Sequence, residues 1–519
     1  MTPLDLSVPS SLMMAIIPEL VLMGGAMLIL LWAGWRRDSE QHQRNVGVAS
    51  LILVALTIGA TIWSANRFTS VVPGGPVTID SFRWAMDIVI LIGAGLTIAL
   101  GMDDNRRELV HAPETHVLVL LATSGMMLLT AATDLMIVFL GVELMSISVY
   151  ALAGINRRSA RGAEGALKYF LLGAFATAFL LYGIALVYGA TGSTNIDKVA
   201  QAIWSLGVGS SPILAVGMAM LVIGFGFKVA VVPFHMWAPD VYDGAPSSIT
   251  AYMAATVKAA AYATFIRVWL QAFPGVAPEW YRAIYGVAIA SMIAGNAIGL
   301  VQKNLKRMLA YSSIGHAGYL LVLIAAGTEE ATSALVFYLL AYSLATFGAF
   351  AAIVSLAQPG KGTVMIDELS GLWKRRPWMA LGMGVMMLSL LGFPFFGGAG
   401  FFAKWYVLQV ALHAPVPQTM LAVFIVLTSV LSAGYYLHVV MVMFMKPALE
   451  GAPAVEPPRS GGMTRAVMVA TVVLTILLGI APDVLVRWTG RSRITPHASR
   501  LVVTPGVPVA RQTPQPIER

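Results

Sequence analysis

The sequence of 519 residues contains no cysteine and few charged residues. The absence of thiols excludes disulfides, thiolate zinc sites and cysteine-bound iron–sulfur clusters. Only 11% of the residues are charged and 58% are hydrophobic, whereas soluble domains are about one quarter charged. A nucleotide fingerprint is also missing, because Gly224 and Gly226 lie in an apolar run without the strand and turn that such a motif needs. The composition therefore indicates a polytopic membrane protein with no cofactor or metal site of its own.

Apolar stretches of the length that a membrane span requires, about 20 residues, recur along the chain. The sequence therefore predicts an all-α fold with about 14 transmembrane helices. We expect these helices at residues 11–34, 46–65, 82–102, 115–132, 135–154, 164–189, 212–236, 247–271, 281–301, 305–326, 331–356, 378–412, 419–445 and 463–486. The first stretch is too long for a signal-peptide core and follows no basic residues, so it is expected to stay as a membrane helix.

Basic residues gather in alternate loops, which indicates membrane topology rather than nucleic-acid binding. With the N-terminus outside, eighteen lysines and arginines fall in inside loops and five in outside loops. Arg83 and Arg267 are counted among the outside residues, and Lys306 among the inside ones. The positive-inside rule then predicts a multi-pass protein with both termini outside. The basic C-terminal tail is expected to lie on lipid headgroups or on a partner.

A short internal repeat predicts two related helix bundles. The segment Ala166-Leu-Lys-Tyr-Phe-Leu-Leu172 is similar to Ala334-Leu-Val-Phe-Tyr-Leu-Leu340, and each begins an apolar helix. Together with two helices that contain a break, this predicts two inverted five-helix repeats, an arrangement common in transporters. The expected divisions are an N-terminal three-helix segment at 1–112, a first bundle at 113–272, a second bundle at 273–446, and a final helix with a basic tail at 447–519.

Five charged residues lie inside stretches that read as membrane helices: Glu143, Lys168, Lys228, Lys258 and Lys404. A charge in hydrocarbon costs roughly 2.5–3.5 kcal/mol on insertion scales. Such residues usually mark a path for ions or protons, and cations on successive helices are what a proton relay requires. The sequence shows no metal-ligand cluster, Ser–His–Asp arrangement or pair of acid–base carboxylates. These five residues are therefore the candidate catalytic residues of a proton path.

Lys228 lies five residues before Pro233, which removes a backbone donor and should break the helix. Freed carbonyls and water can solvate an ammonium group there, and the alternative is a lysine that snorkels to the interface. Glu143 lies near the centre of its helix. Burial alone would favour its neutral acid, whereas a cation within about 4–6 Å favours the carboxylate. We therefore expect Glu143 to pair with Lys228, the alternative being a neutral acid that only joins two helices.

Lys168 follows Glu164 by four residues, so a salt bridge at the start of the helix is the alternative to a place in the proton path. Lys258 lies among small residues that let other helices approach closely. Tyr262, one turn later, is a candidate relay that would share a proton or a water with Lys258.

Lys404 follows a run of glycines after Pro394, where unwound backbone can line a wet cavity. His316 and His235 are candidate relays because an imidazole titrates near neutral pH, and a packing role is the alternative for each. Two acidic residues in or near helices are interpreted as structural or assembly residues: Glu19 and Asp87.

Several of these motifs together resemble the antiporter-like membrane subunits of proton-pumping NADH:quinone oxidoreductase, respiratory complex I. They are the segment from Lys228 to Tyr242 with the following Ala245-Pro-Ser, the segment around Glu143, Tyr311-Ser-Ser-Ile-Gly-His-Ala-Gly-Tyr-Leu-Leu321, and Gly392-Phe-Pro with Lys404. The likeness covers residues 17–486, and the superfamily includes Mrp-type cation/proton antiporters and membrane-bound hydrogenases. Within this superfamily the chain is most similar to the subunit N family. The features that carry this likeness are the length of the chain, Pro18-Glu19, and a lysine at position 404, where the M type has glutamate. The segment at 394–400 is longer than the usual family pattern.

The resemblance implies a role for each matching residue. Glu143 would be the modulating acid, Lys228 the central proton-carrying lysine, Lys258 the bridge between half-channels and Lys404 the second-bundle lysine near the exit; Lys168 matches a lysine typical of the N type. The resemblance also implies a translocase subunit without a redox site, in a bacterial plasma (inner) membrane, beside subunits M, K and J. NADH, FMN, iron–sulfur clusters and quinone would then be bound by partner subunits. The alternatives are a subunit of an Mrp-type antiporter or of a membrane-bound hydrogenase.

Overall fold

The computed structural model describes residues 12–35, 39–67, 75–358, 362–394, 398–448 and 461–494. The longer helices are α2 Ile17–Trp35, α3 Glu40–Arg67, α4 Ser81–Arg107, α5 Glu114–Ala131, α6 Leu135–Ala153, α7 Ala160–Thr191, α9 Pro212–Val229, α12 Lys258–Ala272, α13 Ala277–Gly299, α14 Leu305–Ala326, α15 Glu330–Leu356, α17 Pro377–Leu391, α18 Gly398–His413, α19 Thr419–Met445 and α20 Gly462–Ile480. The shorter ones are α8 Ile196–Ser205, α10 Ala238–Gly244, α11 Ser247–Tyr252, α16 Leu372–Arg375 and α21 Pro482–Thr489.

The described ranges are helical throughout, apart from turns and three isolated β-bridges. Thirteen helices there are long and apolar enough to cross a membrane, with α11 and α12 counted as one. The shorter α17 and α18 follow each other and make one further, interrupted span. The predicted all-α membrane fold and its number of spans are therefore confirmed.

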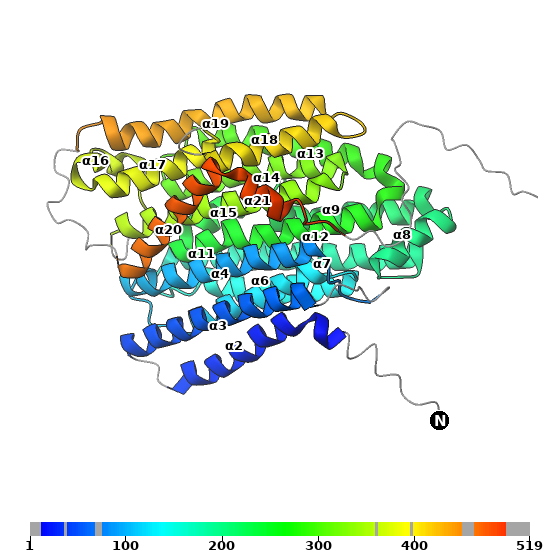
Figure 1. Ribbon diagram of the computed structural model, residues 1–519, viewed down its shortest axis with the longest axis horizontal. Helices are drawn as coiled ribbons and strands as arrows, with labels where there is room; N and C mark the ends of the chain where they lie inside the picture. The colour runs from blue at the N-terminus through cyan, green and yellow to red at the C-terminus, as the bar shows by residue number, and fades with distance from the viewer. Residues whose placement is uncertain are drawn as a thin grey trace, which may run out of the picture.

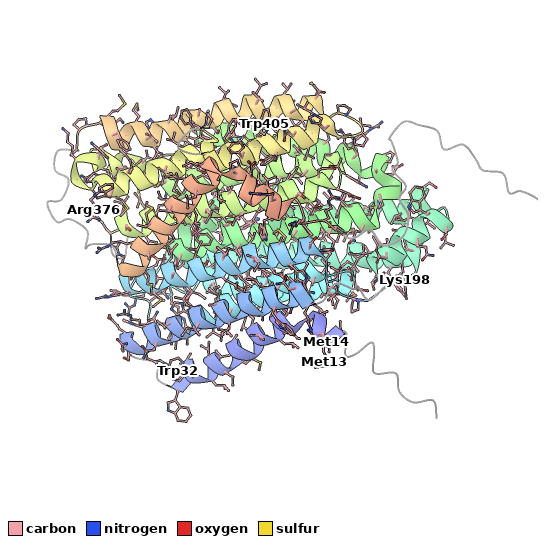
Figure 2. The ribbon with its side chains drawn as sticks, in the orientation of Figure 1. Met13, Met14, Trp32, Lys198, Arg376 and Trp405 are labelled. Carbon is pink, nitrogen blue, oxygen red and sulfur yellow. The ribbon has the colours of Figure 1, made fainter. Side chains whose placement is uncertain are left out.

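The spanning helices lie side by side and run between two ends of the molecule (Figure 1). One end carries the loops with Arg157, Lys303 and Arg376, and is called the basic end below. Arg376 marks it at the left of Figure 2, and Lys198 marks the opposite end at the right. Trp32, near the end of α2, projects away from the bundle in the same view.

The most enclosed helices are those that carry polar residues through the centre. The α11–α12 span is wholly buried in its apolar window, and α14 and α15 are 94% buried. In contrast, α2 is only 28% buried and lies with α3 along one edge, while α19 lies along the other (Figure 1). A polar side chain on a central helix therefore has to find its partners inside the protein.

The order of the helices is the one that an inverted repeat requires. Five spans, from α5 to α12, are followed by five more, from α13 to α19, and an odd number of spans reverses the direction of each counterpart. The two similar heptapeptides lie in the third helix of each set, α7 and α15, and the fourth helix of each set is broken. The domain boundaries predicted above coincide with these sets and stay a prediction.

Both predicted helix breaks are present. Helix α9 ends at Val229, and Ala230 adopts a left-handed conformation with φ of 56°. Pro233 comes four residues after Val229, so in a continuous helix its ring would clash with the carbonyl group of Val229. Helix α17 ends at Leu391, and Gly392 takes φ of 82°, which only glycine adopts readily. Part of the longer segment after Pro394, residues 395–397, lies outside the described residues.

Three cations that sequence reasoning assigned to loops are buried, which corrects those assignments. The side chains of Arg83 and Arg267 are fully enclosed, and Lys306 is 1% exposed. Each of these residues lies near one end of a helix. At such a position, the hydropathy of the sequence does not distinguish a charged residue in a loop from one that is buried in the protein. Other residues of the charge count, and the tail from 495 onward, lie outside the described residues: Arg36, Arg37, Lys361 and Arg459.

Candidate functional site

Lys228 lies in the last turn of α9, immediately before the first break. Its side chain is buried, and its Nζ donates to Ser146 Oγ at 2.7 Å and to Tyr150 Oη at 3.2 Å. Both acceptors belong to α6. The amine also lies 5.2 Å from the centre of the Tyr150 ring and 5.6 Å from that of Phe227, within cation–π range. A buried ammonium is thus held by hydroxyls and ring faces rather than by a carboxylate.

The predicted ion pair between Glu143 and Lys228 is not formed in the described structure. Glu143 lies on α6 one turn before Ser146, is partly exposed, and makes no ion pair with any described residue. Lys228 reaches the same helix through Ser146 and Tyr150 instead. Charge at Glu143 can therefore act on the amine only through space and through these hydroxyl dipoles.

Lys168 belongs to a separate ion cluster at the basic end. It pairs with Glu164 at 2.7 Å and with Asp240 at 2.9 Å, and Arg307 also pairs with Asp240 at 2.8 Å. Burial opposes ionisation of Asp240, but hydrogen bonds from Lys168 and Arg307 lower the pKa of its carboxyl below the usual value. The side chain of Lys168 is 43% exposed, unlike those of the buried lysines. Its geometry therefore fits the salt-bridge interpretation better than a place in the proton path.

Lys258 follows a π-helical turn, Met253–Val257, that links α11 to α12. Such turns leave backbone groups free of the regular helical pattern and occur often at functional sites. The amine of Lys258 donates to the backbone oxygen of Ser313 at 2.6 Å and also contacts its hydroxyl. Tyr262 donates to the backbone oxygen of Ala317 at 2.6 Å and not to Lys258. No direct hydrogen bond joins Tyr262 to Lys258 in the described residues, but both side chains reach α14, and the relay role of Tyr262 stays a prediction.

His316 lies at the centre of the second bundle. Its Nδ1 is 2.6 Å from Tyr338 Oη and its Nε2 is 3.2 Å from Tyr436 Oη. The Tyr436 hydroxyl also bonds Ser312, which adjoins the Ser313 that holds Lys258. Both ring nitrogens of a buried imidazole thus face hydroxyl groups, which can donate or accept a proton.

Lys404, on α18 after the second break, is held in a similar way to Lys228. Its amine donates to the backbone oxygen of Leu391, at the end of α17, at 2.8 Å and to Ser429 Oγ at 3.1 Å. The amine lies 5.1 Å from the ring centre of Tyr319, and that ring is 5.6 Å from the ring of His316. Ser313, His316 and Tyr319 therefore place Lys258, the imidazole and Lys404 along one face of α14.

The remaining predicted relay, His235, is not joined to this network, since its Nδ1 has no hydrogen-bond partner among the described residues. Several partners of the buried amines and of His316 were not predicted from the sequence. Ser146, Tyr150 and Ser313 bind the amines, and Tyr338 and Tyr436 bind the imidazole. Hydroxyl residues are common in membrane helices, so only their spacing from a charged residue was available as a signal. Ser146 is three residues after Glu143, and the Ser312-Ser313 pair comes one turn before His316.

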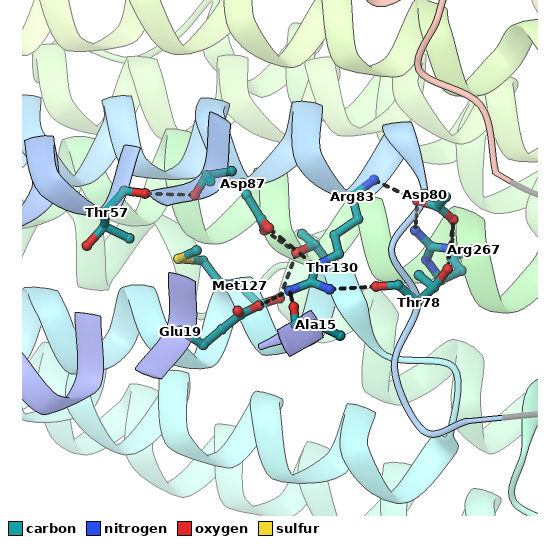
Figure 3. Close-up of polar contacts among 11 residues, drawn as sticks. Ala15, Glu19, Thr57, Thr78, Asp80, Arg83, Asp87, Met127, Thr130 and Arg267 are labelled. Atoms are coloured by element: carbon teal, nitrogen blue, oxygen red, sulfur yellow. Dashed lines mark hydrogen bonds and ion pairs between the residues drawn. The ribbon is translucent and has the colours of Figure 1, made fainter. Parts of the chain in front are cut away.

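A second group of buried charges lies near the opposite end (Figure 3). Arg83 pairs with Glu19 at 2.6 Å and with Asp87 at 3.4 Å, and thereby joins α4 to α2. Asp80 caps α4 and accepts two bonds from Arg267, at 2.6 and 2.9 Å. These contacts join the turn before α4 to the end of α12. The geometry agrees with the structural interpretation of Glu19 and Asp87.

No group of three or more His, Asp or Glu side chains in the described part of the chain lies close enough to hold a metal ion. The chemistry that the buried residues offer is proton exchange between amines, an imidazole and hydroxyls.

The chain matches a family model described as "NADH:quinone oxidoreductase/Mrp antiporter, TM" over residues 132–432. It is 44% identical to NADH-quinone oxidoreductase subunit N of Gemmatimonas aurantiaca, over 97% of this chain and 98% of that protein. It is 39% identical to the subunit N of Methylobacterium nodulans, over 91% of this chain and 96% of that protein.

Solved structures show the same likeness. A chain of respiratory complex I from Thermus thermophilus superposes with a TM-score of 0.76 and 35% identity, covering 91% of this chain and 99% of that one. A chain of the Mrp complex from Dietzia superposes with a TM-score of 0.79 at 24% identity, over 91% of this chain and 96% of that one. The second match shows a shared fold alone.

Proposed function

The chain belongs to the NADH-quinone oxidoreductase subunit N family, and from that premise we propose that it carries protons through the membrane as a subunit of that oxidoreductase. One observation above all supports this function. Three amines, Lys228, Lys258 and Lys404, are buried among hydroxyls with no carboxylate partner in the described residues, and His316 lies between two of them. Buried amines held in this way can change protonation state without breaking an ion pair.

The proposed path runs through the two five-helix sets at 113–272 and 273–446. A proton on Lys228 in the first set passes to Lys258, which contacts Ser313 on α14. From there Tyr436, His316 and Tyr319 lead toward Lys404 in the second set. Protons move along this line as water and hydroxyl groups exchange them, so no covalent chemistry is required of the chain.

The driving force is electrostatic and comes from outside this chain. NADH, FMN, iron–sulfur clusters and quinone are bound by partner subunits, and electron transfer there changes the charge state near Glu143. At an effective dielectric of about 20, two charges 4 Å apart interact by about 4 kcal/mol. Glu143 lies further from Lys228 than that, so the effect is smaller and is transmitted past Ser146 and Tyr150. This assigns Glu143 the role of a modulating acid. Lys168 is the weakest member of the predicted path because it lies in the exposed ion cluster.

We place the protein in the bacterial inner membrane with the basic end inside and both termini outside, by the positive-inside rule. Its partners are the other membrane subunits of the complex, with M, K and J as the proposed neighbours. The exposed apolar faces of α2 and α19 are available for such neighbours or for lipid.

Replacing Lys228 by alanine tests the function in the assembled complex. Inverted membrane vesicles are supplied with NADH, and the protons taken up per NADH oxidised are measured. We expect Lys228→Ala to lower this ratio, whereas Lys198→Ala, which removes an exposed lysine at the opposite end, leaves it unchanged. An unchanged ratio for Lys228→Ala in a fully assembled complex contradicts the proposal. Proton flux that depends on sodium and proceeds without NADH favours an Mrp-type antiporter instead.

A further inference from the structure

A cavity of about 440 Å³ opens at the basic end, apart from the buried lysines. It lies between α3, α4, the start of α20 and the segment that leads into α5. Charges of both signs line it in equal number: Glu40 and Arg44 from α3, Asp103 and Arg106 from α4. The carboxylate of Asp103 also caps α20, because it accepts from the backbone N–H of Thr464 at 2.8 Å. A wall of balanced charge suits water better than an anion or an apolar ligand.

His116, on α5, forms part of the wall of this cavity. Its side chain is buried, with the residue only 1% exposed, and its Nε2 has no hydrogen-bond partner among the described residues. A β-carbon on Gly47 of α3 would lie 3.2 Å from this nitrogen, so α3 packs closely against this side of the imidazole. An unsatisfied buried polar atom costs about 1–3 kcal/mol. Beside a polar cavity, that atom is a natural contact for water.

Another side of the imidazole lies near a serine that binds a buried carboxylate. His116 Nδ1 and Ser248 Oγ each lie 3.9 Å from the position that a β-carbon on Gly101 would take. Ser248 donates to Asp104 twice, from its hydroxyl at 2.7 Å and from its backbone N–H at 2.8 Å. The carboxylate of Asp104 is itself buried. The imidazole ring therefore lines the cavity and lies near an enclosed acceptor.

Further hydroxyl groups lie along α11 and the π-helical turn that follows it. Tyr252 follows Ser248 by four residues, and its Oη is 2.6 Å from Thr123 Oγ1 on α5. Thr256 follows by four more, is buried, and its Oγ1 has no partner in the described residues. Lys258 comes two residues later. The polar side chains on this segment thus lead from the imidazole toward one of the buried amines.

We propose that the cavity is a water-filled vestibule through which protons are taken up from the basic side, and that His116 is the group that accepts them. This inference rests on the proposed function. A hydronium ion gives its proton to Nε2, which forms an N–H bond and leaves a water molecule. The imidazolium then releases its Nδ1 proton toward Ser248 and Asp104, and a ring tautomer change restores the starting state. The step consumes and produces only protons and water.

Charged and titratable groups lie around the cavity and this imidazole on several elements. They are Glu40 and Arg44 from α3, Asp103, Asp104 and Arg106 from α4, and His111 from the turn before α5. Lys306 of α14 lies on the far side, where it donates to the backbone oxygen of Ala245 at 2.9 Å.

The assembled complex in inverted vesicles provides the test. For His116→Gln we expect the protons taken up per NADH to fall as far as in Lys228→Ala, with the double variant no lower than Lys228→Ala alone. For His116→Ala, which opens space beside the vestibule, added imidazole should restore uptake. Pyrazole has a similar shape but does not titrate near neutral pH, so it should not. A purely structural histidine would show no such difference between the two additives.

Other outcomes separate this inference from the proposed function. If Lys228→Ala lowers the ratio and His116→Gln leaves both the ratio and its pH profile unchanged, the vestibule is wrong and the proposed function stands. If neither change lowers the ratio, the proposed function fails. A response to anionic lipid content without imidazole rescue identifies a lipid headgroup site and overturns the vestibule.

A further variant covers the case in which changes at His116 prevent assembly. Gly47→Ala leaves the imidazole in place but sets a methyl group 3.2 Å from Nε2, with only the flexible Met102 side chain closer. We expect it to lower uptake, whereas Gly59→Ala on the same helix, with nothing within 4 Å, should not. Normal uptake by assembled Gly47→Ala overturns the vestibule.

Discussion

Replacing Gly173 by alanine tests the contact between Lys228 and Tyr150 without altering an ionisable group. Gly173 lies on α7, and a β-carbon there would be 1.9 Å from Tyr150 Oη, 2.6 Å from Cζ and 3.0 Å from Cε1. An ordinary contact begins near 3.4 Å, so the hydroxyl must move by about 1.5 Å. Because three atoms of one rigid ring are affected, the ring has to turn as a unit. Such overpacking costs about 1–3 kcal/mol.

Displacing the Tyr150 hydroxyl breaks one of the two hydrogen bonds that Lys228 donates to hydroxyl groups. A hydrogen bond to a charged group contributes about 1.5–3 kcal/mol. Losing it alters the balance between charged and neutral lysine by roughly one to two powers of ten. We therefore expect Gly173→Ala to lower the protons taken up per NADH in inverted vesicles while the complex still assembles.

The control for this variant lies on the same helix. Gly189 has nothing within 4 Å of the added carbon, so Gly189→Ala should leave both assembly and proton uptake unchanged. Tyr150→Phe removes the same hydroxyl directly and should reproduce the defect of Gly173→Ala. Full proton uptake by assembled Gly173→Ala refutes the idea that Tyr150 helps to set the protonation of Lys228.

Two further predictions concern stability. Arg267→Gln leaves the carboxylate of Asp80 buried without its two-bond partner, which should lower the free energy of unfolding by about 3–5 kcal/mol. The double change with Asp80→Asn should cost less than the single one, and thermal unfolding of the detergent-solubilised complex measures both; equal stability of Arg267→Gln and the parent contradicts the reasoning. Gly295→Ala would set a carbon 2.4 Å from the backbone nitrogen of Gly315, so α13 and α14 must separate at a cost of about 3 kcal/mol or more. The amount of folded chain in the membrane should fall, whereas Gly286→Ala on the same helix meets nothing within 4 Å and serves as the control; normal levels of Gly295→Ala count against the close packing.

Hydropathy and proline placement predicted most of the fold because both act locally. A span shows itself by about 20 apolar residues, and Pro233 interrupts a helix wherever it lies. The π-helical turn before Lys258 was not predicted, since it depends on how neighbouring helices pack around an apolar segment. The burial of Arg83 and Arg267 was missed for a related reason. Each lies near the end of a span, and its partner is distant in the sequence.

The sequence pointed to the charged residues of the candidate site but not to the uncharged residues that contact them. A lysine inside an apolar run is conspicuous because its cost in hydrocarbon is high. A tyrosine or serine there is ordinary, so Tyr436 and Ser313 gave no signal until the fold placed them against His316 and Lys258. No direct ion pair joins Glu143 to Lys228, although Glu143 shares a face of α6 with Ser146 and Tyr150 and its charge acts on the amine through space.

The bond between Asp80 and Arg267 has a consequence for how the chain is made. Their residues are almost two hundred positions apart, yet both side chains are sealed from lipid and water. During synthesis, Asp80 reaches the membrane long before Arg267 leaves the ribosome. The seven described spans that precede α11 and α12 are therefore made while the carboxylate of Asp80 still lacks this counter-ion. A chain truncated before residue 267 would keep that carboxylate without its partner.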